Sequence, residues 1–177
     1  MKLHLKFSLL LVAIIIGSLK ANAQQPTFRD SLLSHLAGKW VATGVIAKKH
    51  TTHNITARWV LNHQYLRIDE VSEEKDSTGT LSYQATVYVG WLQATSSYAC
   101  VWLDDYGSVS PESIGTAKKD TTNTIAFVFH YGPAIFHTTF KYNPSNNTWQ
   151  WLMDNEDKGI LEPFARLTLR PSSPPTP

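Results

Sequence analysis

Residues 36–46 read LAGKWVATGVI, and this stretch joins a short helical pattern to the first of a long series of strands. The segment just before it, PTFRDSLLSHLA, has leucines that share one face at helical spacing: Leu32, Leu33 and Leu36. From Trp40 onward the pattern becomes the alternation of a strand. The sequence therefore predicts a short helix near residues 28–37, lying across one end of the structure that the strands form, with its leucines pointing inward.

A period of two dominates the chain after this junction. The runs are rich in Val, Ile, Thr and aromatic residues, which suit a pleated surface, and turn residues such as Asp, Asn and Gly separate them. They predict about ten strands. The predicted strands cover residues 39–49, 55–61, 65–72, 83–91, 97–103, 113–119, 124–131, 134–142, 148–153 and 164–170.

The connections between these runs are short, and this decides how the strands pair. Short links join antiparallel neighbours, because parallel pairs need long crossovers. No later helical pattern is long enough to cover a sheet, so the apolar face must be hidden by the sheet folding on itself. The prediction is an all-β fold, an antiparallel up-and-down barrel of about ten strands with one short N-terminal helix. A β-sandwich is the alternative.

The N-terminus has the features of a secretory signal peptide. Lysines at the start precede a ten-residue apolar run at residues 7–16, and Ala21-Asn-Ala23 supplies a small-residue cleavage site. The run is too short to span a bilayer, which takes about 20 residues; a retained anchor is the alternative. We therefore expect a signal peptide at residues 1–23 cleaved after Ala23, a domain at 24–170 and a disordered proline-rich tail at 171–177. The expected location is secreted or periplasmic, without a stable membrane anchor.

Cleavage also changes the charge. The chain has a net charge of +2, and removing the three lysines of the leader leaves −1. A nearly neutral domain without a basic cluster is a poor candidate for nucleic-acid binding. The single cysteine, Cys100, cannot form an internal disulfide, and its apolar strand context predicts a buried, inert thiol.

Gly38 and Trp40, placed after a short helix and before a first strand, resemble the signature of the lipocalin-like (calycin) barrels. The resemblance implies that Trp40 closes one barrel end and packs on an arginine of the last strand, Arg166 or Arg170. Over about residues 30–170 the chain also resembles a bacterial family of lipocalin-like domains of unknown function, the DUF1579 type. The stretches that carry this likeness are GKWVATG, RWVLNHQYL, VYVGW, WLDDYG and IGTA. Ten strands fit the wider-barrel branches, such as fatty-acid-binding and haem-binding nitrobindin-type proteins.

Common catalytic motifs are absent from the sequence. It contains no Cys-x-x-Cys, His-Glu-x-x-His, Gly-x-Gly-x-x-Gly, P-loop or Gly-x-Ser-x-Gly, which argues against the enzyme classes that depend on them. His50 and His53 are expected in the link between the first two strands. His130 and His137 flank a Tyr-Gly-Pro turn and could approach each other at a barrel end. Two histidines are too few for a metal site, so no metal or other cofactor is predicted, with haem as an alternative.

A ten-stranded barrel is wide enough to leave a cavity, and aromatic residues are abundant on its strands. We expect an enclosed apolar pocket with Arg58 as the first candidate polar anchor, followed by His130 and His137. Which face of each strand points inward stays open, and Arg58 and the similar Arg67 could also face water. At least two of four tryptophans should line the pocket: Trp59, Trp91, Trp102 and Trp151.

These observations predict an exported protein that binds a small apolar or amphipathic molecule. Two alternatives remain. One is an enzyme with a polar cluster in the barrel lumen, and the other is a nitrobindin-like haem protein.

Overall fold

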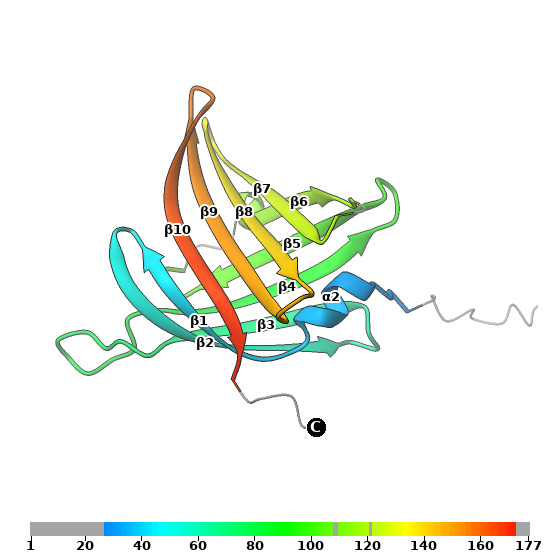
Figure 1. Ribbon diagram of the computed structural model, residues 1–177. Coiled ribbons are helices and arrows are strands. Elements are labelled where there is room, and N and C mark those ends of the chain that lie inside the picture. The colour runs from blue at the N-terminus through cyan, green and yellow to red at the C-terminus, as the bar shows by residue number, and fades with distance from the viewer. Residues whose placement is uncertain (1–26, 108–109, 121, 173–177) are drawn as a thin grey trace, which may run out of the picture.

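The computed structural model describes residues 27–107, 110–120 and 122–172. In this part of the chain, ten antiparallel strands form a closed barrel in which β1 pairs with both β2 and β10 (Figure 1). The strands are β1 (Gly38–Ile46), β2 (Lys49–Val60), β3 (Tyr65–Ser72), β4 (Gln84–Leu92), β5 (Ser97–Asp104), β6 (Ile114–Lys118), β7 (Thr124–Tyr131), β8 (Ala134–Asn143), β9 (Thr148–Asp157) and β10 (Ile160–Pro171). Helix α2 (Ser31–Leu36) precedes β1, and a 3₁₀ turn, η1 (Pro111–Ser113), precedes β6.

The predicted all-β, up-and-down barrel of ten strands is confirmed, and it is consistent with a calycin-like fold. The predicted signal peptide lies outside the described residues, as does most of the predicted tail, residues 173–177. β10 extends to Pro171, which pairs with Trp40, so the barrel runs one residue further than expected. Within the described ranges, no helix is long and apolar enough to cross a membrane.

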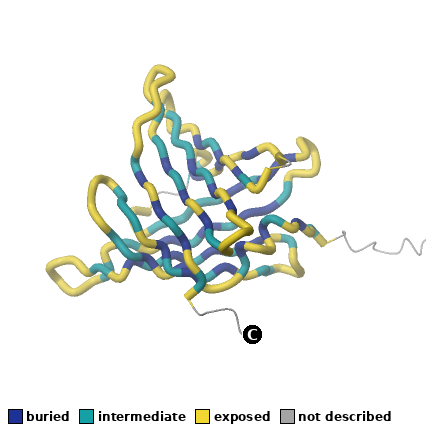
Figure 2. Tube along the Cα trace, in the orientation of Figure 1, coloured by how far each residue is buried: buried dark blue, intermediate teal, exposed yellow. Residues whose placement is uncertain are grey.

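Burial alternates along the strands and identifies the inner face (Figure 2). On β3, Leu66 and Ile68 are buried while Arg67 between them is only partly covered. The five largest fully buried side chains are aromatic and come from β5, β7 and β9: Tyr98, Phe127, Phe129, Trp149 and Trp151. These side chains fill much of the barrel interior, so the lumen is a packed aromatic core over a large part of its length.

Helix α2 covers the end of the barrel where β1 and β5 begin. Leu33 and Leu36 are each 1% exposed, and Leu32 is partly buried against the same core, as the helical spacing predicted. The Trp40 indole is buried and donates a hydrogen bond from Nε1 to the carbonyl oxygen of Leu36, 2.8 Å away. Gly38 has a φ of 146°, a conformation that L-residues rarely adopt, and it makes the turn from α2 into β1. This end of the barrel is the closed end.

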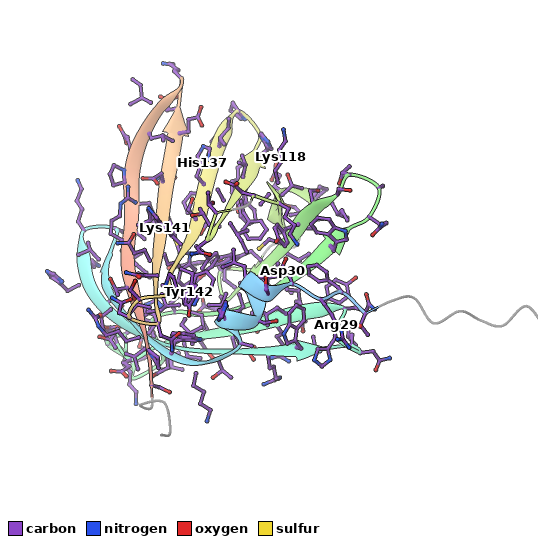
Figure 3. All side chains as sticks on the ribbon, turned by 45° about the vertical axis from the view of Figure 1, so that its right-hand side comes forward. Arg29, Asp30, Lys118, His137, Lys141 and Tyr142 are labelled. Carbon is purple, nitrogen blue, oxygen red and sulfur yellow. The ribbon has the colours of Figure 1, made fainter. Side chains whose placement is uncertain are left out.

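Asp30 fastens α2 to the barrel wall. One carboxylate oxygen, Oδ1, caps the helix by accepting from the Leu33 amide at 2.9 Å. The other, Oδ2, accepts from the Tyr98 hydroxyl at 2.7 Å and from Lys119 Nζ at 2.9 Å. Burial raises the pKa of Asp30, but these three hydrogen bonds and the lysine charge outweigh it, so the pKa is lowered overall. Figure 3 shows Asp30 beside the helix.

The link between the first two strands differs from the prediction. β1 ends at Ile46, and a tight turn at Ala47 and Lys48, with φ of 47° and 68°, starts β2 at Lys49. His50 and His53 therefore lie inside β2 and not in a loop. The turn was missed because two residues with positive φ are usually Asn or Gly, which carry the recognisable signal.

The expected contact between Trp40 and an arginine of the last strand is not formed. Arg166 and Arg170 are exposed and flank the buried Leu167 and Leu169, so they lie on the outer face of β10. The Arg166 guanidinium bonds outward instead, to the Met153 carbonyl at 2.8 Å and to the Asp154 carboxylate. The Trp40 indole is therefore held by α2, through its hydrogen bond to the Leu36 carbonyl oxygen, and not by an arginine side chain.

Candidate ligand site in the barrel lumen

The polar residues expected to anchor a ligand all lie on the outer face. Arg58 is 54% exposed, and it shares Asp69 with Arg67, whose Nη2 lies 2.7 Å from Asp69 Oδ1. His130 is exposed, and His137 Nε2 lies 2.6 Å from Glu156 Oε2 on the outer side of β8 and β9 (Figure 3). Charged strand residues face water here because their immediate neighbours are the apolar ones.

The four tryptophans expected to share one pocket fall into two groups. Trp59 and Trp91 lie near the closed end, each with its ring centroid 5.8 Å from that of Phe28. Trp102 and Trp151 lie deeper in the lumen, with centroids 5.7 Å apart. Only the second pair belongs to the site described below.

Four inward-facing residues on β2, β3, β5 and just before β4 form the lumen polar cluster: His53, Glu70, Tyr83 and Trp102. His53 Nδ1 and Glu70 Oε1 lie 2.5 Å apart, and the His53 ring stacks on Tyr83 with centroids 5.9 Å apart. The Trp102 indole donates to the Tyr83 hydroxyl at 3.0 Å. β4 reaches the closed end at Trp91, and Ala85 lies at its opposite end. Ala85 pairs with both Glu70 and Asp104, so the cluster lies in the half of the barrel remote from α2.

The His53–Glu70 pair is almost completely removed from water. The two residues are 2% and 1% exposed, and burial raises the pKa of Glu70 while the hydrogen bond and charge of His53 oppose that rise. Glu70 Oε2 is buried and has no hydrogen-bond partner among the described residues. A buried acceptor left unpaired costs about 1–3 kcal/mol. The site therefore contains a polar atom that a ligand group could satisfy.

Tyr83 stays protonated at any physiological pH. Burial and the nearby charge of Glu70 both raise the pKa of its hydroxyl. Because the hydroxyl oxygen already accepts from Trp102, its own proton can be donated to a second group in the lumen. The polar cluster thus offers one acceptor, Glu70 Oε2, and one donor, the Tyr83 hydroxyl.

An aromatic wall continues from the polar cluster. The Trp102 ring lies 6.4 Å from Phe129 and 5.7 Å from Trp151, measured between centroids. Nearer the end of the barrel remote from α2, Phe136 and Phe164 are partly buried and meet edge to face, with their ring centroids 5.7 Å apart. Apolar walls with a few placed polar groups are typical of small-molecule sites.

Two hollows are found among the described residues, and the second has Glu70 and Asp104 in its lining. One, of about 650 Å³, is lined by outer-facing residues of β8, β9 and β10 that include Lys141, Gln150 and Arg170. The other, of about 670 Å³, lies over the outer side of β3, β4 and β5 and includes Arg67 and Tyr88. Neither is the enclosed lumen pocket expected from the sequence, because large aromatic side chains occupy the interior.

The next question is whether the described residues include a group of possible metal ligands. The described ranges contain no group of three or more His, Cys, Asp and Glu residues that could hold a metal ion. Among the described histidines, His53 is the buried one, with Glu70 bound to Nδ1 and Tyr83 over the ring. Cys100 is also buried on the inner face, and burial raises the pKa of its thiol, as expected of an inert cysteine.

Sequence reasoning missed Glu70, His53 and Tyr83 as a group. Glu70 alternates with Leu66 and Ile68 in YLRIDEVS, so an acid on the apolar face of a strand was the available signal. His53 could be found only by recognising the Ala47-Lys48 turn, which places it in register with Ser72. Tyr83 stands just before β4, and only the fold brings it beside Trp102.

No protein-family model matches this chain, and no curated protein matches it.

Proposed function

We propose that this protein binds a small amphipathic molecule in the half of the barrel remote from α2. In this proposal the protein is a DUF1579-type member of the calycin group that is exported by its N-terminal segment to the periplasm or the cell exterior. The ligand's apolar part packs against the aromatic wall, and its polar part reaches the lumen polar cluster.

The observation that carries the proposal is the unpaired Oε2 atom of Glu70. A protein core that served stability alone would gain by pairing or removing such an atom. Here it lies buried beside His53, in a wall that continues into Trp102 and the other aromatic residues. An unsatisfied acceptor next to apolar surface is suited to a ligand that has both characters.

The packed interior sets a condition on binding. Trp102, Phe136 and Phe164 are only partly buried, so they are the side chains that can move to admit a ligand. The ligand then contributes about 25 cal/mol for each Å² of apolar surface it buries. Part of this gain is offset by the rearrangement, which favours a compact molecule.

Fluorescence titration with the neutral apolar dye N-phenylnaphthylamine tests this proposal. We expect saturable binding with one site, and Trp102→Leu should weaken it by about tenfold because it removes part of the wall. Trp59→Leu is the matched control, since Trp59 packs at the closed end against Phe28, and its affinity should match the unmodified protein. Absence of saturable binding, or equal weakening by both variants, would refute the lumen site.

A catalytic role for the same cluster is the second candidate. A buried histidine bound to a carboxylate can transfer protons, and Tyr83 supplies a further hydroxyl. This alternative requires that the unmodified protein converts a substrate, and that this catalytic activity is lost in both His53→Ala and Glu70→Gln. The haem alternative depends on His53 as the ligand; a Soret band after haem addition that disappears in His53→Ala would support it.

A further inference from the structure

Glu70 is engaged on one side only. Its Oε1 atom lies 2.5 Å from His53 Nδ1, while Oε2 has no partner among the described residues. The side chain is 1% exposed, so bulk water does not provide the missing partner. Any ligand that reaches the lumen polar cluster meets this oxygen.

The chemistry of Oε2 does not depend on where the shared proton lies. A separation of 2.5 Å leaves room for one proton between Nδ1 and Oε1. If the proton is on Nδ1, Glu70 is a carboxylate; if it is on Oε1, Glu70 is a neutral acid. In both forms Oε2 accepts hydrogen bonds.

The other groups of this half of the barrel disfavour an anion. Asp104 follows Trp102 by two residues on the inner face of β5, and its charge raises the pKa of both Glu70 and Tyr83. The arginines that could have neutralised a carboxylate, Arg58 and Arg67, pair with Asp69 outside the barrel. Lys119 is 53% exposed and is bound to Asp30 at the closed end, away from the lumen polar cluster.

We infer that the polar end of the ligand is a hydrogen-bond donor, and that the ligand is an apolar alcohol and not a carboxylic acid. This inference rests on the proposed function, whose ligand it specifies. A hydroxyl matches both groups of the cluster, because it donates to Glu70 Oε2 while its oxygen accepts from the Tyr83 hydroxyl. A carboxylate could accept from Tyr83, but in either form of Glu70 it has no proton to donate to Oε2, and the two oxygens would repel each other.

Displacement of bound N-phenylnaphthylamine at neutral pH compares three ligands of equal chain length: decanol, its methyl ether and decanoic acid. The ether keeps the oxygen acceptor and loses only the donated hydrogen. We expect decanol to displace the dye at a concentration about tenfold lower than either of the others, since a hydrogen bond to a charged or buried group is worth about this factor. An ether or an acid as effective as decanol would overturn the inference.

Glu70→Gln provides the test from the protein side. The glutamine carbonyl can accept from His53 Nδ1 and then presents an NH₂ donor where Oε2 was. We expect the preference for the alcohol over the acid to fall by at least about tenfold. Glu73→Gln is the matched control, because Glu73 is exposed and follows closely on the same chain segment; it should keep the preference of the unmodified protein.

The outcomes separate the two proposals. If the unmodified protein does not bind the dye, the proposed function fails, and this inference fails with it. If the dye binds and decanol shows no advantage, only the inference fails. If circular dichroism shows that Glu70→Gln does not fold, the comparison of the three ligands on the unmodified protein still tests whether the ligand is an alcohol.

Discussion

Asp30 shows how one side chain can set the position of a whole element. It caps α2 and accepts from Tyr98 and Lys119, yet it is 2% exposed. A buried acid is tolerable here because each of its oxygens has a hydrogen-bond partner. The same carboxylate therefore serves as a helix cap and as the fastening of the closed end.

We expect Asp30→Asn to lower the free energy of unfolding by about 2 kcal/mol at neutral pH, because the amide keeps an oxygen acceptor but loses the charge-assisted bonds. The folded pKa of Asp30 lies below the unfolded value of about 3.8. Its contribution is therefore present above pH 3.8 and is lost as the pH falls through the folded pKa. Urea unfolding from pH 7 to pH 2 should show the two proteins converging at the acid end; a difference that stays constant would contradict this account.

At the scale of elements, alternation and turn composition were sufficient for the strand count and for the short helix. Alternation could not show which face of a strand is inside. Arg58, His130 and His137 were therefore plausible lumen residues until the burial of their neighbours placed them outside. Glu70 was the reverse case. The residues two and four positions before it are apolar and buried, so the sequence could have predicted that Glu70 points inward. That its Oε2 atom has no hydrogen-bond partner depends on how strands far apart in sequence pack around it, which the sequence does not show.

Helix α2 has six residues and could not persist without packing. Leu33→Ala should lower the free energy of unfolding by about 3 kcal/mol, because it leaves a cavity under the helix at a position that is 1% exposed. The neighbouring Leu32→Ala is the matched control, and we expect about 1 kcal/mol because Leu32 is only partly buried. Equal losses in chemical denaturation would show that the helix does not pack as described.

At the scale of the whole molecule, the closure of the barrel is uneven. β8 and β9 pair in continuous register from Ile135–Glu156 to Asn143–Thr148. β6 has five residues, and its pairing with β7 rests on one register pair, Thr116 with Val128. The strand pair β6–β7 is therefore the weakest part of the closed sheet.

Hydrogen exchange should reveal this difference. We expect amides on the facing edges of β6 and β7 to exchange about a hundredfold faster than those between β8 and β9, because fewer bonds must break for local opening.

A disulfide between Thr116→Cys and Val128→Cys should suppress the fast exchange, since directly opposed residues on antiparallel strands are about 4.5–5.5 Å apart at Cα. The native Cys100 is buried with a raised pKa, so it should not compete for the new thiols. Reducing the disulfide provides the control, because it should restore the fast exchange at β6 and β7 and leave the exchange at β8 and β9 unchanged. Uniform exchange around the barrel would show that the strand pair β6–β7 is not the weakest part of the sheet.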